Sequence, residues 1–128
     1  HIFDPVLTDL DKRLATHYGF TVIVENERGS RPITRPTLFY MPHCGLPLYS
    51  SVLRSNWSPK TLPLLAIIGN SFDAYAMHPQ LHRQGPFVQR ALKRVVECPF
   101  PDEFPGGISV FNNTGLHLFG DGGGGRKD

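Results

Sequence analysis

Residues 37–44 read TLFYMPHC, a strand-forming run that Pro42 stops and that a histidine and a cysteine follow. β-branched and aromatic side chains favour a strand, and a proline ends one because it has no N–H to give to the sheet ladder. Two other apolar runs stop in a similar manner, one at Asp4-Pro5 and the other at Gly69-Asn70-Ser71. The sequence therefore predicts three strands that each end in a polar turn.

Helical patterns separate these strands. Thr8 is a predicted N-cap, and Gly19 is the predicted left-handed end of the helix that follows it. Apolar residues recur at helical spacing over residues 46–53 and 87–96, so two more helices are predicted there. The β-branched run 20–24 predicts another strand, one that is buried on both faces.

Apolar strands that alternate with amphipathic helices are typical of an α/β domain. We expect a three-layer, Rossmann-like domain over residues 1–119, with a mostly parallel sheet that helices cover on both faces. Its last part is expected to be a proline-rich loop over residues 98–107, followed by short edge strands at 108–111 and 116–119. The glycine-rich residues 120–128 are expected to form a flexible tail.

Composition and charge narrow the choice of partners. The chain has 128 residues and a formal net charge of +2, with scattered basic residues, so a nucleic-acid partner is not expected. The apolar runs are about eight residues or shorter, whereas a membrane helix needs roughly 20, so no membrane partner is expected either. Cys44 and Cys98 are the only cysteines and do not make a disulfide framework. We expect reduced thiols in a cytoplasmic or nuclear protein.

The polar turns after the strands supply the candidate ligand site. In an open parallel sheet, ligands bind in the crevice outside the carboxyl ends of the strands. Turns that each follow a strand should therefore meet at one edge. The candidate ligand-binding residues are Asp4, His43, Cys44, Gly69, Asn70 and Ser71.

Each candidate has a chemical role and a plainer structural alternative. Asp4 could accept hydrogen bonds from ribose hydroxyls, or it could be an acidic turn residue. His43 could transfer a proton and Cys44 could be a nucleophile or soft ligand, or both could be structural. The turn 69–71 could present a helix N-terminus to an anion, or it could be an ordinary strand-to-helix turn. No motif identifies catalytic residues.

The remaining motifs are weaker. His78 and His82 are four residues apart, but Pro79 lies between them and no third ligand is evident, so no metal site is predicted. Cys98-Pro99 has the cysteine-proline form that is seen where haem binds reversibly through a thiolate. Three alternatives therefore stay open: haem, a nucleotide-type ligand, or no cofactor.

Several ordered motifs resemble the Sensitivity-to-Red-Light-Reduced family over nearly the whole chain before the glycine-rich tail. They are FDP at 3–5, ENERG at 25–29, PTLFYMPHC at 36–44, LY at 48–49, SNWS at 55–58, IIGNSF at 67–72, VFNNT at 110–114 and HLF at 117–119. The chain departs from the family at Gly45, where members often carry an acidic or larger polar residue. Members also begin the domain with a further strand and a glycine-containing turn. That strand would be central, so the ligand site of this chain is expected to be incomplete, or to be completed by a partner chain.

The resemblance implies a regulatory protein rather than a known enzyme. The family is tied to red-light signalling and circadian clock output in plants, and to regulation of haem synthesis in animals and fungi. We expect a domain that acts by binding a protein partner or a small molecule. The alternative is a nucleotide-type or methyltransferase-like enzyme with its crevice at the carboxyl edge of the strands.

Overall fold

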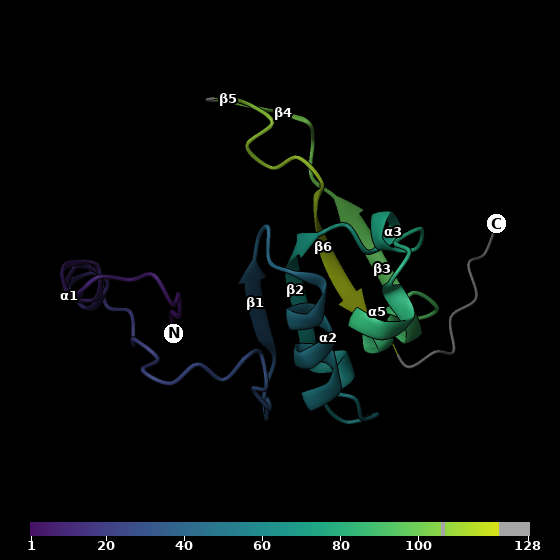
Figure 1. Ribbon diagram of the computed structural model, residues 1–128, viewed down its shortest axis with the longest axis horizontal. Helices are drawn as coiled ribbons and strands as arrows, with labels where there is room; N and C mark the ends of the chain where they lie inside the picture. Colours follow the sequence, from purple (N-terminus) through teal and green to yellow (C-terminus); the bar gives the residue numbers. More distant parts are fainter. Residues whose placement is uncertain (106, 121–128) are drawn as a thin grey trace.

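The computed structural model describes residues 1–105 and 107–120, and the predicted tail beyond residue 120 lies outside them. Figure 1 shows a sheet with helices packed on one face and an N-terminal segment set apart. The helices are α1 (Asp9–His17), α2 (Leu46–Ser55), the 3-10 helix η1 (Leu62–Leu64), α3 (Phe72–Tyr75), α4 (Leu81–Gln84) and α5 (Pro86–Ala91). The strands are β1 (Thr37–Met41), β2 (Leu65–Asn70), β3 (Val95–Pro99), β4 (Glu103–Phe104), β5 (Gly107–Ile108) and β6 (Thr114–Phe119).

The main sheet is mixed, with the strand order β1-β2-β6-β3. β1 pairs in parallel with β2, with Phe39 opposite Ile67, whereas β6 runs antiparallel to both of its neighbours. The expected mostly parallel, Rossmann-like sheet is therefore not confirmed, because two of its three strand pairings are antiparallel. The chain passes from β3 to β6 through the small β4–β5 hairpin, without a helical crossover. A return of that kind brings two strands together antiparallel.

Several boundaries predicted for the last third of the chain are wrong. The helix predicted for residues 87–96 ends at Ala91, and its last valines begin β3. The loop predicted for 98–107 supplies the end of β3 and the hairpin strands, and the strand predicted for 108–111 is reduced to β5. Residues 116–119, predicted at an edge, belong to the inner strand β6. Short apolar runs fit a helix and a strand equally well, so periodicity alone could not separate them.

The first two predicted helices are confirmed. Thr8 accepts a hydrogen bond from the Asp11 N–H at 3.2 Å, and the Asp11 carboxylate accepts one from the Thr8 N–H at 2.8 Å, which completes a capping box. Gly19 follows α1 with φ +85°, the left-handed conformation that glycine adopts without strain. α2 covers the predicted span 46–53 and continues to Ser55. None of the helices that the structure describes is long and apolar enough to cross a membrane.

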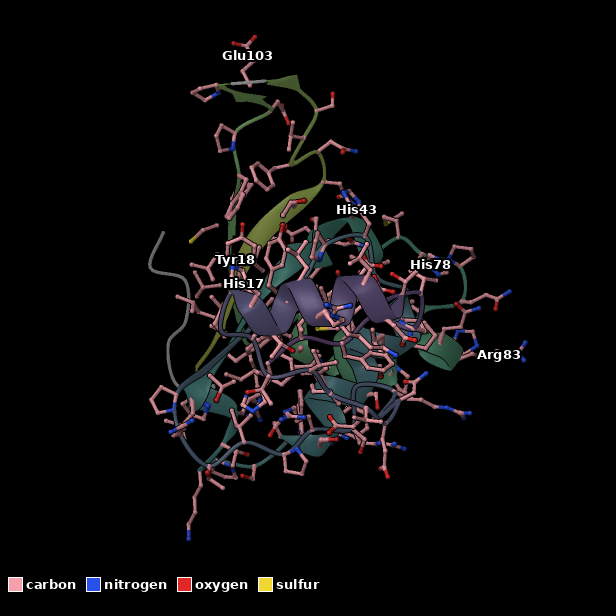
Figure 2. All side chains as sticks on the ribbon, turned by 90° about the vertical axis from the view of Figure 1, so that its left-hand side faces the viewer. His17, Tyr18, His43, His78, Arg83 and Glu103 are labelled. Atoms are coloured by element: carbon pink, nitrogen blue, oxygen red, sulfur yellow. The ribbon has the colours of Figure 1, made fainter. Side chains whose placement is uncertain are left out.

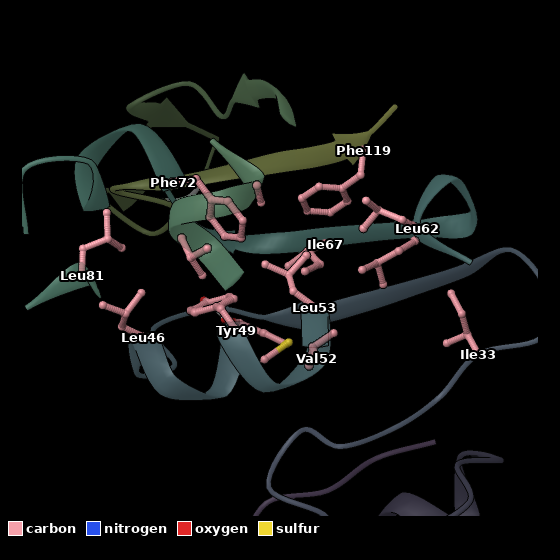
Figure 3. Close-up of a cluster of buried hydrophobic side chains, with 14 residues drawn as sticks. Ile33, Leu46, Tyr49, Val52, Leu53, Leu62, Ile67, Phe72, Leu81 and Phe119 are labelled. Carbon is pink, nitrogen blue, oxygen red and sulfur yellow. Dashed lines mark hydrogen bonds between the residues drawn. The ribbon is translucent and has the colours of Figure 1, made fainter. Parts of the chain in front are cut away.

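The hydrophobic core lies on one face of the sheet (Figure 3). α2 and α5 pack against each other there, and the largest fully buried side chains include Tyr49, Leu53, Ile67 and Phe72. Ile67 of β2 is completely buried. Burial of a side chain of this size stabilises the fold by roughly 1.5–3 kcal/mol. This half of the molecule therefore provides the rigid base for the loops at the carboxyl edge.

The opposite face of the sheet is open. Leu38 and Tyr40 of β1 are 55% and 63% exposed, and Val96 of β3 and Leu118 of β6 are 60% and 43% exposed. The strand register sets Leu38, Leu118 and Val96 in one row across the sheet. The expected three-layer arrangement is thus a two-layer one within the described residues, with helices on a single face.

The N-terminal segment stands apart beyond the β1 edge of the sheet (Figure 1). Residues 20–24, predicted to be a buried strand, form only one parallel bridge, between Ile2 and Val22, and Val24 is 91% exposed. α1 buries none of its residues. Among the described residues β1 pairs only with β2, so no hydrogen-bonded ladder connects this segment to the sheet. An isolated pair of strands is at best marginally stable in water, which explains the loss of the predicted strand.

Candidate functional site

The loop after β1 presents an exposed histidine in a strained backbone conformation. His43 has φ +58°, in the left-handed region that non-glycine residues rarely adopt. Its side chain is exposed (Figure 2), and its backbone N–H donates a hydrogen bond to the Asn70 Oδ1 atom at 2.7 Å. Backbone strain of this kind persists only where surrounding contacts fix it. The loop therefore holds His43 outward at a defined position.

Asn70 fastens the ends of β1 and β2 together. Besides accepting from His43, its side-chain Nδ2 donates to the Cys44 carbonyl at 2.9 Å and to the Tyr75 hydroxyl at 3.0 Å. The Asn70 backbone N–H donates to the Tyr49 hydroxyl at 3.0 Å. The Asn70 side chain thus makes its hydrogen bonds to other groups of the protein. It therefore fixes the shape of the site and does not contact a ligand directly.

Tyr49 explains why residue 69 is a glycine. A Cβ atom on Gly69 would lie 2.6 Å from the Tyr49 hydroxyl oxygen, closer than such contacts occur. The Tyr49 hydroxyl also donates a hydrogen bond to the Met41 carbonyl. Burial raises the pKa of Tyr49 to about 12, so this hydroxyl keeps its proton at physiological pH. The absence of a side chain on Gly69 thus makes room for a core tyrosine that joins β1 to β2.

The N-terminus of α3 already holds an anion from this chain. Ser71 caps the helix by accepting from the Ala74 N–H at 3.1 Å, and the N–H groups of Phe72 and Asp73 donate to Glu97 Oε2 at 2.9 and 3.0 Å. The anion position expected at the turn 69–71 is therefore taken by the Glu97 carboxylate, which approaches from β3.

His117 lies buried beneath this helix end. Its Nδ1 is 3.1 Å from the Ile67 carbonyl oxygen, and its Nε2 is 3.4 Å from Glu97 Oε2. A carbonyl only accepts, so Nδ1 carries a proton, and Nε2 is left to accept weakly from the Phe72 N–H at 3.4 Å. Burial lowers the pKa of His117, although the Ile67 carbonyl and the Glu97 charge oppose the shift. His117 and Glu97 form a polar group inside the core that sequence reasoning missed.

The negative charge of Asp4 acts on the thiol of Cys44. The Asp4 carboxylate accepts a hydrogen bond from the Val6 N–H at 3.0 Å and is exposed. Cys44 is partly buried and is not in a disulfide. Burial raises the pKa of the Cys44 thiol, and the negative charge of Asp4 raises it further. The charge of Asp4 is therefore felt at Cys44, which is a protonated thiol rather than a reactive thiolate.

The other candidates lie elsewhere. The His78 ring nitrogen Nδ1 accepts from the Gln80 N–H at 3.2 Å, and His82 is exposed on α4. Cys98 belongs to β3 and is exposed, not part of the loop predicted for it. The part of the chain that the structure describes holds no group of three or more side chains suited to a metal ion. His43, Asp4 and Cys44 therefore remain the residues on which a site can be argued.

The helical layer, the mixed sheet and the loop that Asn70 fixes define a small α/β domain with a polar site at the carboxyl edge of β1 and β2. A family model described as the SRR1 domain matches residues 1–118. The chain belongs to the SRR1 family, which confirms the resemblance drawn from the sequence motifs.

Curated relatives share this similarity. An SRR1-like protein of Drosophila melanogaster is 35% identical over 117 residues, which cover 91% of this chain and 41% of that protein. An SRR1-like protein of Mus musculus is 47% identical over 72 residues, 56% of this chain and 29% of that protein. The protein SENSITIVITY TO RED LIGHT REDUCED 1 of Arabidopsis thaliana is 32% identical over 128 residues, 94% of this chain and 46% of that protein. The chain thus spans less than half the length of these relatives, and no solved structure matches it significantly.

Proposed function

We propose that this chain is a regulatory domain that acts by binding a protein partner or a small molecule at the carboxyl edge of β1 and β2. The binding residues are His43, Asp4 and Cys44. The turn 69–71 supports these residues without contacting the ligand: Asn70 fixes the loop, Gly69 leaves room for Tyr49 and Ser71 caps α3. The proposal rests on His43, whose side chain is exposed and whose backbone is left-handed. The His43 N–H donates to Asn70 Oδ1 at 2.7 Å, which fixes this conformation.

Two further observations favour binding over catalysis. The pKa of Cys44 is raised by burial and by Asp4, which is the opposite of what a nucleophilic cysteine requires. The anion position at the start of α3 is filled by Glu97 from the same chain. The exposed imidazole of His43 can still donate and accept hydrogen bonds, which suits reversible recognition.

The relatives support a signalling role. The Arabidopsis thaliana relative is named for reduced sensitivity to red light. We extend the proposal to red-light signalling and to the finer roles that the family resemblance implies, circadian clock output and regulation of haem synthesis, in the cytoplasm or nucleus.

A complementation experiment tests this proposal. The chain is substituted for the matching segment of the Arabidopsis thaliana relative in plants that lack that protein, and the red-light response of seedlings is measured. We expect the wild-type segment to restore the response and His43→Ala to fail at equal protein abundance. His82→Ala, which removes an exposed histidine from α4, is the matched control and should restore it. Restoration by His43→Ala would show that the site is not the functional one.

A methyltransferase-like enzyme is the second candidate, and the sheet order favours it. β6 is the last strand in sequence, runs opposite to the others and lies between β2 and β3. That layout resembles part of the sheet of S-adenosylmethionine-dependent methyltransferases, and the exposed Asp4 carboxylate would accept hydrogen bonds from ribose hydroxyls. Layout alone does not establish activity. Saturable binding of S-adenosylmethionine in calorimetry, lost in Asp4→Ala and kept in Asp9→Ala, would favour this candidate over the first.

A further inference from the structure

A second surface lies at the opposite end of the sheet from His43. α2 starts after the carboxyl end of β1 and runs back, so Trp57, just beyond its end, lies toward the amino ends of the strands. Arg94 directly precedes β3, which runs in the same direction as β2 because both are antiparallel to β6. Trp57, Gln89, Arg90, Lys93 and Arg94 line an open hollow of about 410 Å³ there. This surface is therefore separate from the site of the proposed function.

Arg90 is held in place by two aromatic rings. Its guanidinium carbon lies 5.2 Å from the centre of the Trp57 ring and 5.0 Å from the centre of the Phe87 ring. The two rings meet edge to face with their centres 5.4 Å apart. Cation–π contacts of this kind are attractive and reduce the rotamer freedom that an arginine would lose on binding a ligand. The planar donor group of Arg90 is thus positioned before any partner arrives.

The cations of this surface have no acidic partners within the described residues. The ion pairs within the described residues join Lys12 to Asp9, Arg31 to Glu27 and His117 to Glu97. None of them involves Arg90, Lys93 or Arg94. The sequence from Pro86 to Arg94 contains no carboxylate. Three positive charges within five residues therefore face solvent beside an indole ring.

We propose that this surface binds an acidic segment of a partner protein. A guanidinium binds a carboxylate through two parallel hydrogen bonds, and the Arg90 guanidinium lies over the Trp57 and Phe87 rings. Lys93 and Arg94, in the turn between α5 and β3, supply two more positive charges for the carboxylates of one peptide. Trp57 supplies the apolar contact that aromatic residues provide in interfaces. Nucleic acid fits less well, because the net charge of +2 and the scattered basic residues lack an extended basic track.

Charge reversal tests the proposal with the full chain. The probe is a fluorescein-labelled oligoglutamate peptide, followed by fluorescence anisotropy at low and at physiological ionic strength. We expect saturable binding that Lys93→Glu with Arg94→Glu weakens at least about tenfold. The control is Lys12→Glu with Arg13→Glu on α1, which changes the net charge equally and should leave binding unchanged. An equal loss in both double variants, or no binding by the wild type, would overturn the proposal.

Arg90 variants separate the shape of the site from its charge. Arg90→Lys keeps the positive charge but removes the planar donor pair, so we expect a loss of a few-fold in affinity for the peptide with an unchanged melting temperature. Arg90→Gln should lose more. Affinity in Arg90→Lys equal to the wild type would contradict the role given to the stacked guanidinium. Tighter binding of a labelled single-stranded oligonucleotide than of the peptide, lost in the Lys93 and Arg94 variant, would replace the acidic segment by nucleic acid and also overturn the proposal.

Discussion

Residues 65–68 and residues 20–24 are both apolar strand-forming runs, yet the first contributes buried side chains to the core and the second is largely exposed. In β2, Leu65 and Ile67 are 2% and 0% exposed, with β1 on one side and β6 on the other. In the N-terminal run, Val24 is 91% exposed and Phe20 is 49% exposed. The difference comes from neighbours rather than from strand propensity, which measures how well a residue fits a pleated, half-buried surface.

The sheet itself repeats this contrast on its two faces. The face under α2 and α5 buries Ile67, while the other face leaves Tyr40 of β1 63% exposed. A run of alternating side chains supplies apolar residues to both faces, but helices cover only one of them in the described residues. The molecule therefore has one half whose stability depends on packing and another, α1 with the runs beside it, whose structure is local.

The largest expected effect comes from truncating the packed half. Ile67→Ala should lower the free energy of unfolding by roughly 2–5 kcal/mol, because it leaves a cavity in a close-packed core. Val24→Ala should change it by no more than about 0.5 kcal/mol, as for other exposed positions. Urea unfolding followed by the fluorescence of Trp57, the single tryptophan, measures both. A cost for Val24→Ala near that for Ile67→Ala would mean that residues 20–24 are packed after all.

The next effect separates the support of the site from its surface. Asn70→Ala should lower the free energy of unfolding by about 1–3 kcal/mol, because the His43 N–H loses its acceptor and the Cys44 carbonyl loses the closer of its two donors. His43→Ala should stay within about 0.5 kcal/mol of the wild type, since the His43 side chain is exposed. Thermal and urea unfolding of both variants check this. The order would be reversed if the His43 ring held the loop in place.

Much of the edge site could be predicted from the sequence because its signals are local. A proline or polar turn directly after an apolar run marks a strand end, and such ends gather at one edge of a sheet. His43 follows β1, as this reasoning predicts. The run before Asp4 makes only the bridge between Ile2 and Val22, so Asp4 does not end a strand of the sheet. The purely structural reasons for Gly69 and Asn70 could not be found, because they depend on Tyr49 and on the loop 42–44, which only the folded chain brings near.

The mixed sheet and its buried polar pair were missed for a related reason. The position of β6 between β2 and β3 is set by pairing between residues far apart in sequence. The sequence pattern predicts that residues 95–96 continue a helix and that residues 98–99 begin a loop. Without that strand, nothing indicated that Glu97 would reach the start of α3 or that His117 would face the core. Once β6 is known, its alternation places His117 on the same face as Phe119, which is buried.

The His117–Glu97 pair predicts a pH dependence of intermediate size. Because the pKa of His117 is lowered in the fold, the folded protein binds fewer protons at this ring than the unfolded chain does. The free energy of unfolding should therefore fall as the pH drops below the unfolded value of about 6.5, by at most about 1.4 kcal/mol per pH unit. Asp73 and Glu97 are the acidic groups that oppose the shift.

Melting temperatures between mildly acidic and neutral pH test this dependence. His117→Asn keeps a donor for the Ile67 carbonyl but cannot be protonated, so its melting temperature should depend less on pH in this range. Val24→Ala is the control, because it changes an exposed and uncharged side chain and should leave the wild-type dependence intact. A steeper fall with acid in His117→Asn than in the wild type would show that other groups govern the transition.

The smallest expected effect comes from the two N-caps, which lie in the two contrasting halves. Thr8→Ala removes the cap of α1 and Ser71→Ala removes that of α3, and each loses a backbone hydrogen bond worth about 1 kcal/mol to its helix. α1 buries no residue, so the loss of Thr8 should speed hydrogen exchange within α1 and leave the global free energy of unfolding unchanged. α3 carries the fully buried Phe72, so the loss of Ser71 should appear in global unfolding. Equal losses of global stability in the two variants would mean that α1 is docked on the sheet, and the division of the molecule into a packed and a local half would fail.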